Sequence, residues 1–146
     1  MAEMTERIAE FINLRSPEDK LRLACQCVKR CYERGQTVTV HVADAADAER
    51  LDALLWTFED GAFIPHIRLA EAHQPMIEPV VICCGEETLV EAEALVEAAG
   101  AEPSRRPEGF SHVIDFAETY EPRLRELSRR RYKALQEAGY RMRFVE

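Results

Sequence analysis

The sequence lacks clustered glycines. Its six glycines are all isolated, and they are Gly35, Gly61, Gly85, Gly100, Gly109 and Gly139. A phosphate-binding loop needs several glycines at a strand–helix junction, so that backbone N–H groups can approach the phosphates. The first such junction here is the segment NLRSP from Asn13 to Pro17, in which the proline removes an N–H. Nucleotide binding is therefore not expected.

The sequence also lacks the spacing of a metal site. None of the five cysteines belongs to a C-x₂-C pair, and they are Cys25, Cys27, Cys31, Cys83 and Cys84. The four histidines form no set with Asp, Glu or Cys at metal-ligand spacing. We expect reduced, buried thiols that behave as small apolar residues, and we expect no metal or other cofactor.

Long apolar runs are missing as well. No run approaches the roughly 20 residues that a membrane span requires, and the charged N-terminus has no apolar signal-peptide core. The chain has 146 residues, of which 47% are hydrophobic, and this suits a globular protein. We expect one domain over residues 1–146, located in the cytoplasm and without membrane contact.

Positive charge is scarce except near the C-terminus. The formal net charge is −8, yet the segment from Arg123 to Arg143 holds eight basic and two acidic residues. This segment carries +6, so the rest of the chain carries −14. An acidic protein is repelled by nucleic acid at long range, while a local basic segment still attracts anions. The asymmetry favours an acidic peptide over DNA as the ligand, and DNA contact is expected only indirectly.

Predicted strands alternate with predicted helices. Strands are expected at Arg7–Leu14, Thr37–Val42, Val80–Cys84 and Phe110–Phe116, with a short edge strand near Ile67–Leu69. Helices are expected at Pro17–Arg34, from Asp44 or Asp47 to Phe58, at Glu87–Ala99 and at Pro122–Ala138. Ala101–Gly109 is predicted as a loop and the residues after Gly139 as a tail. This order predicts a three-layer α/β sandwich with a mainly parallel sheet flanked by helices, Rossmann-like but without a nucleotide-binding loop.

An enzyme of the doubly wound α/β class is the alternative hypothesis. Such enzymes bind small molecules beyond the carboxyl ends of the strands, here near Leu14, Ala43 and Cys84. A cysteine nucleophile at Cys83 or Cys84 is conceivable there, but no sequence motif specifies it. The histidines at 41 and 112 are predicted to form local hydrogen bonds in or beside the core.

The only tryptophan lies in an aromatic run that surrounds a turn. The run is LWTFEDGAFIPH, from Leu55 to His66, and its turn signal is Glu59–Gly61. Large apolar side chains this close to a turn either plug the end of the core or form an adhesive surface. We expect a mixture of the two, with Phe58 inside and Trp56 or Phe63 partly exposed.

The last predicted helix has an apolar stripe and a neighbouring cationic row. At 100° per residue, one apolar stripe collects Leu124, Leu127, Arg131, Leu135 and Ala138. Arg125, Arg129 and Lys133 form a neighbouring i, i+4, i+8 row, with Tyr132 between the row and the stripe. This row is either a solvated face or a site for an acidic peptide that ends in an apolar side chain. Arg131 requires a buried partner, and Asp115 and Asp52 are the candidates.

Two motifs together resemble the chi subunit family of bacterial DNA polymerase III holoenzyme. The first runs from Trp56 to His66, and the second is LRELSRRRYKA from Leu124 to Ala134, followed by Ala138-Gly139-Tyr140. The resemblance implies a non-catalytic accessory subunit of the clamp-loader assembly. Such a subunit links the assembly, through the psi subunit, to the acidic tail of single-stranded-DNA-binding protein (SSB), which ends in Phe with a free carboxylate.

The resemblance also implies two sets of contact residues. The SSB-tail site maps onto Arg125, Arg129, Tyr132 and Lys133. The psi site maps onto Trp56, Phe63, Ile64, Pro65 and His66. Ala117 and Glu118 lie where the family's pocket is often more apolar, so the resemblance does not define the depth of the tail pocket.

Overall fold

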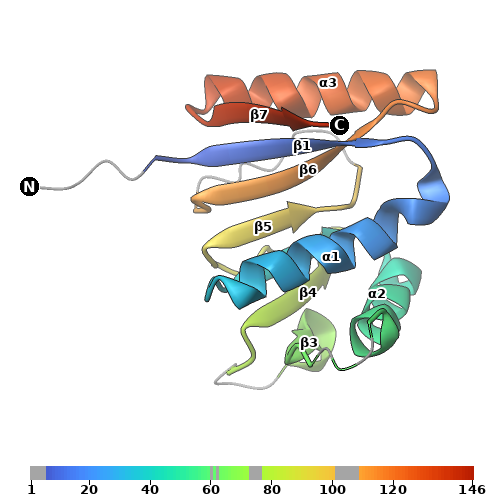
Figure 1. The fold of residues 1–146 in the computed structure, drawn as a ribbon, viewed down its shortest axis with the longest axis vertical. Helices are drawn as coiled ribbons and strands as arrows, with labels where there is room; N and C mark the ends of the chain where they lie inside the picture. Colours follow the sequence, from blue (N-terminus) through green and yellow to red (C-terminus); the bar gives the residue numbers. More distant parts are fainter. Residues whose placement is uncertain (1–5, 60, 62, 73–76, 101–108) are drawn as a thin grey trace, which may run out of the picture.

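Seven parallel strands form one sheet in the computed structural model, which describes residues 6–59, 61, 63–72, 77–100 and 109–146 (Figure 1). The strands are β1 (Ile8–Leu14), β2 (Val38–Val42), β3 (His66–Arg68), β4 (Val80–Cys84), β5 (Ala94–Glu97), β6 (His112–Glu118) and β7 (Arg141–Val145). Their order across the sheet is β3-β4-β2-β5-β6-β1-β7, and every neighbouring pair is parallel. The predicted α/β class is confirmed, with a sheet that is wholly parallel.

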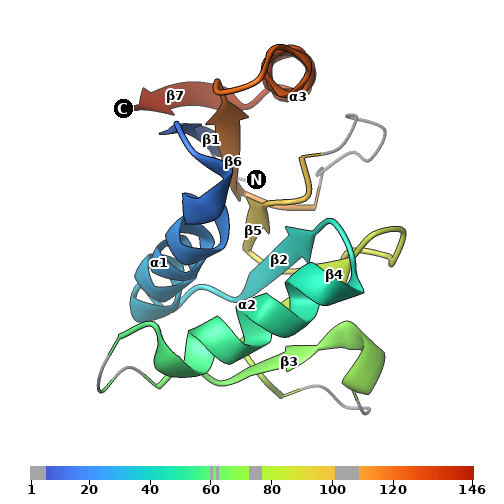
Figure 2. The same ribbon diagram turned by 90° about the vertical axis from the view of Figure 1, so that its right-hand side faces the viewer.

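Three helices flank the sheet on its two faces (Figure 2). They are α1 (Lys20–Glu33), α2 (Ala45–Thr57) and α3 (Pro122–Glu137), with short 3₁₀ turns η1 (Pro17–Asp19) and η2 (Leu69–Glu71). Apolar residues of α1 and α2 pack with Val38, Val40 and Val42 in one core cluster. Leu135 of α3 packs with Phe11 and other residues on the opposite face. The side chains of each strand alternate between the faces, so one parallel sheet supplies both cores.

Both α2 and α3 begin directly after a residue whose side chain caps the helix. Asp44 caps α2, because its carboxylate accepts a hydrogen bond from the Asp47 N–H at 2.9 Å. Glu121 caps α3 in the same way and is followed by Pro122 at the first helical position. Gly139 follows the end of α3 with a φ of 93°, a left-handed conformation that glycine adopts without strain. These signals explain why both helices were predicted nearly to the residue.

The helix predicted at Glu87–Ala99 is wrong. Ala94–Glu97 instead forms β5, which lies between β2 and β6 in the middle of the sheet. The preceding residues cross the second face of the sheet without a helix: the Thr39 hydroxyl donates to Val90 O at 2.6 Å, and Cys83 donates to Thr88 O. Burial of Ala94, Leu95 and Val96 with ladder hydrogen bonds on both sides outweighs the helix propensity of this Ala- and Glu-rich segment.

The predicted C-terminal tail is also wrong, because Arg141–Val145 forms the edge strand β7 beside β1. Its pairing begins with the Arg141 N–H, which donates to Arg7 O at 2.8 Å. The other strand predictions are confirmed with shifts of one or two residues at their ends. Most of the loop predicted at Ala101–Gly109 lies outside the described residues.

Glu10 joins β1 to both α1 and β6. Its carboxylate lies 2.7 Å from His112 Nε2 and accepts a hydrogen bond from Arg30 at 3.1 Å. The hydrogen bond to His112 lowers the pKa of Glu10 to about 2, against the opposing effect of burial, and Arg30 adds to the lowering. The buried carboxylate is therefore ionised and paired in the folded protein.

Replacement of the Glu10 carboxylate is expected to make the free energy of unfolding less dependent on pH in the acid range. Because folding lowers the pKa of Glu10, its stabilisation is present above pH 4.5 and is lost as the pH falls from 4.5 towards 2. We expect Glu10→Gln to lower the free energy of unfolding at pH 7 by roughly 2 kcal/mol and to reduce the change between pH 5 and 2. Urea unfolding at several pH values measures this, with the exposed Glu126→Gln as control. An unchanged acid slope in Glu10→Gln would contradict the assignment.

Candidate functional site

A buried ion pair fixes α3 on the sheet. Arg131 Nε donates to the carboxylate of Asp115 in β6 at 3.0 and 3.2 Å. Its guanidinium also donates to Phe116 O at 3.2 Å and to Ser128 Oγ at 3.3 Å. Burial raises the pKa of Asp115 to about 6, against the lowering effect of Arg131, and the carboxyl remains ionised at pH 7. Of the two candidate partners for Arg131, the structure selects Asp115, while Asp52 lies beside His66.

The anchored helix presents its cationic row to solvent. Arg125, Arg129 and Lys133 are all exposed, and Tyr132 is half-buried at the edge of the core. The predicted apolar stripe is confirmed in outline, with Arg131 and Leu135 buried and Leu124, Leu127 and Ala138 half-buried. The orientation follows from the wheel pattern together with the ion pair, since Arg131 can reach Asp115 only when this stripe faces the sheet.

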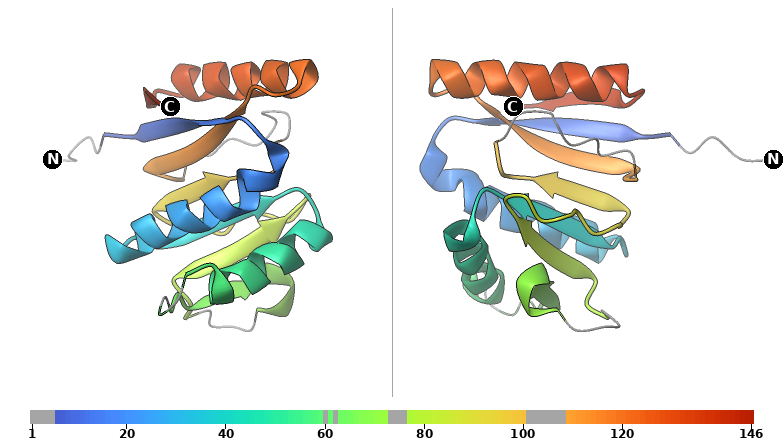
Figure 3. Two further views of the ribbon diagram at one scale, coloured as in Figure 1. Left: turned by 45° about the vertical axis from the view of Figure 1, so that its right-hand side comes forward. Right: turned by 180° about the vertical axis from the view of Figure 1, so that it is seen from behind.

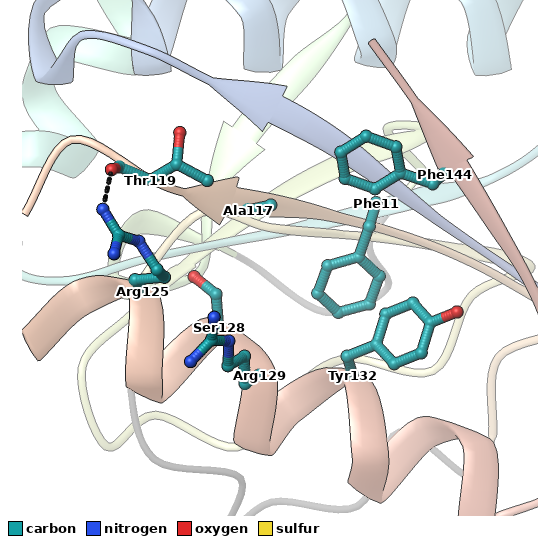
Figure 4. Close-up of a pocket in the computed structure, with 8 residues that line it drawn as sticks. All are labelled: Phe11, Ala117, Thr119, Arg125, Ser128, Arg129, Tyr132 and Phe144. Atoms are coloured by element: carbon teal, nitrogen blue, oxygen red, sulfur yellow. Dashed lines mark hydrogen bonds between the residues drawn. The ribbon is translucent and has the colours of Figure 1, made fainter. Parts of the chain in front are cut away.

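A pocket of about 380 Å³ opens between α3 and strands β1, β6 and β7 (Figure 4). Its lining residues are Phe11, Ala117, Thr119, Arg125, Ser128, Arg129, Tyr132 and Phe144. Three of the four residues predicted for the tail site lie in this lining. The fourth, Lys133, is exposed one turn further along α3. The pocket therefore brings together the residues that the sequence pattern singled out, apart from Lys133.

The pocket has an apolar floor and a cationic rim. The rings of Phe11 and Tyr132 meet edge to face, with centroids 5.1 Å apart. Phe144 of β7 adds a second aromatic wall and is 54% exposed. On the rim, Arg125 donates to Thr119 O at 2.9 Å, so its guanidinium is held beside Thr119, at the end of the pocket away from the aromatic rings (Figure 4). A ligand with an apolar group next to an anionic group matches this arrangement.

Several pocket residues escaped the sequence analysis. Phe144 was assigned to a tail, although the alternation of Met142 and Phe144 with arginines is a strand signal. Phe11 was placed in a strand without a site role. Ala117 does line the pocket, so a small side chain there leaves room within it. Glu118 does not line the pocket: its carboxylate accepts hydrogen bonds from Lys20 and Tyr120 and lies 3.7 Å from Arg131 Nη2.

The aromatic run forms a patch at the opposite edge of the sheet, next to β3. Trp56 is 48% exposed and Phe63 is 68% exposed, with ring centroids 5.7 Å apart. Ile64 and His66 are buried, and Pro65 is half-buried. His66 orders the loop: its Nδ1 lies 2.7 Å from Ile64 O and its Nε2 lies 3.2 Å from Asp52 O. The five residues thus divide into an exposed aromatic pair, Trp56 and Phe63, and three residues that are buried or half-buried beneath it.

The pocket and the aromatic patch are far apart. The patch adjoins β3, the first strand in the sheet order, whereas the pocket includes Phe144 from β7, the last strand. The two views in Figure 3 place α3 at one end of the molecule and α2, which carries Trp56, towards the other. One ligand on each surface therefore leaves the other surface accessible.

Side chains fill the carboxyl ends of β1 and β6, one of the places where a small-molecule enzyme would hold its substrate. At the end of β6 the Glu118 carboxylate lies 3.1 Å from Lys20 Nζ and 2.7 Å from the Tyr120 hydroxyl. A Cβ at Gly100 would lie only 2.8 Å from Glu118 Oε1, so this corner is tightly filled. The titratable groups here pair with one another rather than converge on an open cleft.

The described cysteines and histidines lie mostly inside the core. Burial raises the pKa of Cys25 and Cys27 to about 12, and it raises that of Cys84 as well, so these thiols stay protonated. His41 is buried, with ring nitrogens 2.9 Å from Glu97 and from Gly85 O. Within the described ranges, no group of three or more His, Cys, Asp or Glu residues is placed to hold a metal ion. The helices of the described part are too short or too polar to cross a bilayer.

These observations define an α/β protein with a wholly parallel sheet and no glycine-rich phosphate loop at its first strand–helix junction. The family model described as DNA polymerase III chi subunit, HolC, matches residues 4–143. The chain belongs to the DNA polymerase III chi subunit family.

Curated relatives agree with this assignment. The chain is 31% identical to the DNA polymerase III subunit chi of Pseudomonas aeruginosa over 124 residues, which cover 85% of this chain and 84% of the relative. It is 27% identical to the subunit of the same name from Escherichia coli over 121 residues, covering 83% and 81%. It is 25% identical to that of Haemophilus influenzae over 120 residues, covering 82% of each chain.

Loss of the buried guanidinium is expected to destabilise the protein strongly. Arg131→Leu leaves the Asp115 carboxylate buried without its partner, which costs about 3–5 kcal/mol. The double variant Arg131→Leu/Asp115→Leu removes both charges and is expected to recover a large part of that loss. Urea unfolding at pH 7 measures the free energy of unfolding of the unaltered protein, the single variant and the double variant. The exposed Arg129→Leu is the matched control. Equal stability of Arg131→Leu and Arg129→Leu would contradict a role for the pair in holding α3.

Proposed function

We propose that this protein is a non-catalytic accessory subunit of the bacterial replicative DNA polymerase, within its clamp-loader assembly in the cytoplasm. It bridges the psi subunit to the C-terminal tail of SSB and meets DNA only indirectly. The observation that carries the proposal is the pocket with an aromatic floor and an arginine rim. Membership of the chi family and the wide separation of the two candidate surfaces support it.

The pocket matches the end of an acidic peptide chemically. A terminal apolar side chain fits against Phe11, Tyr132 and Phe144, where it removes aromatic surface from water. The terminal carboxylate then lies at the rim, within reach of the exposed guanidinium of Arg129. Arginine binds carboxylates through two parallel hydrogen bonds, which gives direction as well as strength. Lys133 extends the positive charge towards the acidic residues that precede the terminus.

The exposed aromatic pair is the proposed contact for psi. Trp56 and Phe63 offer the residue types that dominate binding energy at protein interfaces. His66 supports Trp56, because the centroids of the two rings are 4.5 Å apart. Both nitrogens of His66 lie close to backbone oxygens, which hold its ring in place. Ile64 is buried in the core and Pro65 follows it, half-buried, so we propose that their part in binding psi is to position the aromatic rings.

Reversal of one rim charge is expected to abolish most of the tail binding. In fluorescence anisotropy with a labelled SSB-tail peptide, Arg129→Glu should raise the Kd by more than about 10-fold, since a favourable charge pair becomes a repulsive one. Binding to the unaltered protein should weaken as salt is added. Phe63→Ala is the control and should leave the Kd unchanged. Full affinity in Arg129→Glu would exclude the proposed tail site.

The opposite pattern is expected for psi. Phe63→Ala removes an exposed aromatic ring and with it the stacking partner of Trp56, so co-purification of psi from cells that express both proteins should fall to background. Arg129→Glu should retain psi at the level of the unaltered protein. If Phe63→Ala captures psi normally, or if both variants lose it equally, the aromatic patch is not the psi contact.

A further inference from the structure

The outer edge of β7 pairs with no other strand in the part of the chain that the structure describes. β7 is the last strand in the sheet order, and among the described strands it pairs only with β1. The Arg141 N–H points to β1, since it donates to Arg7 O. Backbone groups alternate in direction along a strand, so the N–H and C=O groups of Met142 and Phe144 point away from the sheet. Such an edge accepts an added strand from a binding partner.

The cationic row of α3 runs along this edge. The turn at Ala138–Tyr140 joins α3 to β7, so the two elements are antiparallel and lie side by side (Figure 1). Lys133 therefore lies towards the start of β7 and Arg125 towards its end. The row faces β7 rather than β5, because its neighbour Tyr132 packs on Phe11 of β1 and the pocket reaches Phe144.

We infer that the acidic segment before the terminal residue of the tail pairs with β7 as an eighth strand of the sheet. This inference rests on the proposed function, since it extends the same ligand beyond the pocket. With its last side chain between Phe11 and Phe144, the peptide leaves the pocket past Phe144 and continues towards Lys133 and Arg141. Read from its N-terminus, it runs in the same direction as β7, so the added strand is parallel like the other seven.

Charge on both sides of the edge selects an acidic strand. Arg141 and Arg143 alternate with Met142 and Phe144, so they project from the face of the sheet opposite to α3, and both are exposed. Arg141 is paired with Glu6 at 2.7 Å, so Arg143 supplies most of the charge on this face. Lys133 and Arg129 lie on the α3 side. An acidic strand at this edge would meet positive charge on both of its faces. A second copy of β7 would instead oppose arginine to arginine, which disfavours edge-to-edge self-association.

Amide hydrogen exchange tests the inference directly. NMR of the full-length protein, free and saturated with the acidic SSB-tail peptide, follows the amides of Met142 and Phe144. Both should exchange quickly in the free protein and at least about 10-fold more slowly in the complex, because each outward amide gains a partner or is shielded by the added strand. A tripeptide with only the last three tail residues should fill the pocket without protecting Met142. The amide of Arg141, already bonded to Arg7 O, is the internal reference.

The outcomes separate this inference from the proposed function. If the tail peptide shifts the resonances of Tyr132 and Arg129 while Met142 and Phe144 exchange as in the free protein, the pocket is correct and the added strand is wrong. If the peptide causes no shift at all, both are wrong. Protection of both amides by the tail peptide, together with none at Met142 from the tripeptide, supports the inference.

A charge variant gives a second, independent measurement. Arg143 lies outside the pocket, so Arg143→Glu should raise the Kd of the tail peptide about 5-fold and leave the Kd of the tripeptide unchanged. Arg22→Glu, an exposed charge reversal on α1, is the matched control and should change neither. Equal loss of affinity for both peptides in Arg143→Glu, or no loss for either, would overturn the added strand.

Discussion

The position of α3 depends on the buried guanidinium of Arg131 and its ion pair with Asp115, and the pocket depends on α3 for Tyr132 and for the arginines of its rim. The stripe that faces the sheet is not wholly apolar, because Arg131 occupies its centre. Burial of two charges costs free energy that a leucine contact would not, so the pair is weak evidence for stability. It does fix geometry: the guanidinium reaches Asp115, Phe116 O and Ser128 together only at one rotation of the helix. That rotation seats Tyr132 on Phe11 and turns Arg125 and Arg129 outward.

The same pair ends a row of polar groups that crosses the centre of the sheet. His41, Glu97 and Asp115 are register neighbours on β2, β5 and β6. His41 bonds to Glu97, and the helix supplies Arg131 at the other end. At the β2 end of this row, a helix with a wholly apolar stripe would pack that stripe against charged side chains. The chain instead covers the β2 end with residues 85–93, whose carbonyls at Gly85 and Val90 accept hydrogen bonds from His41 and Thr39.

The elements that the sequence predicted are those with local signals, and the elements that it missed depend on pairing with distant strands. The ends of α2 and α3 and the strand β4 follow from caps, glycines and a continuous apolar run, all of which act locally. β5 does not, because Ala94–Glu97 resembles a helix until its neighbours and their hydrogen bonds are known. β7 was missed for the same reason: only pairing with β1 makes a strand of these exposed residues. The wheel pattern therefore identified the cationic rim, while the aromatic wall contributed by Phe144 required the sheet order.

An adaptor between two proteins needs surfaces that neither overlap nor influence each other strongly. The two proposed surfaces of this protein lie at the two outer ends of the sheet, beside β3 and β7, and the five strands between them are joined by continuous ladders. Their supports are separate as well. His66 holds the aromatic pair through backbone oxygens of its own loop and of α2, whereas Arg131 holds the pocket through β6. Substitutions at distant sites with no shared partners have nearly additive effects. A rigid parallel sheet with a different side-chain anchor at each end is thus a direct way to hold two partners at a fixed separation.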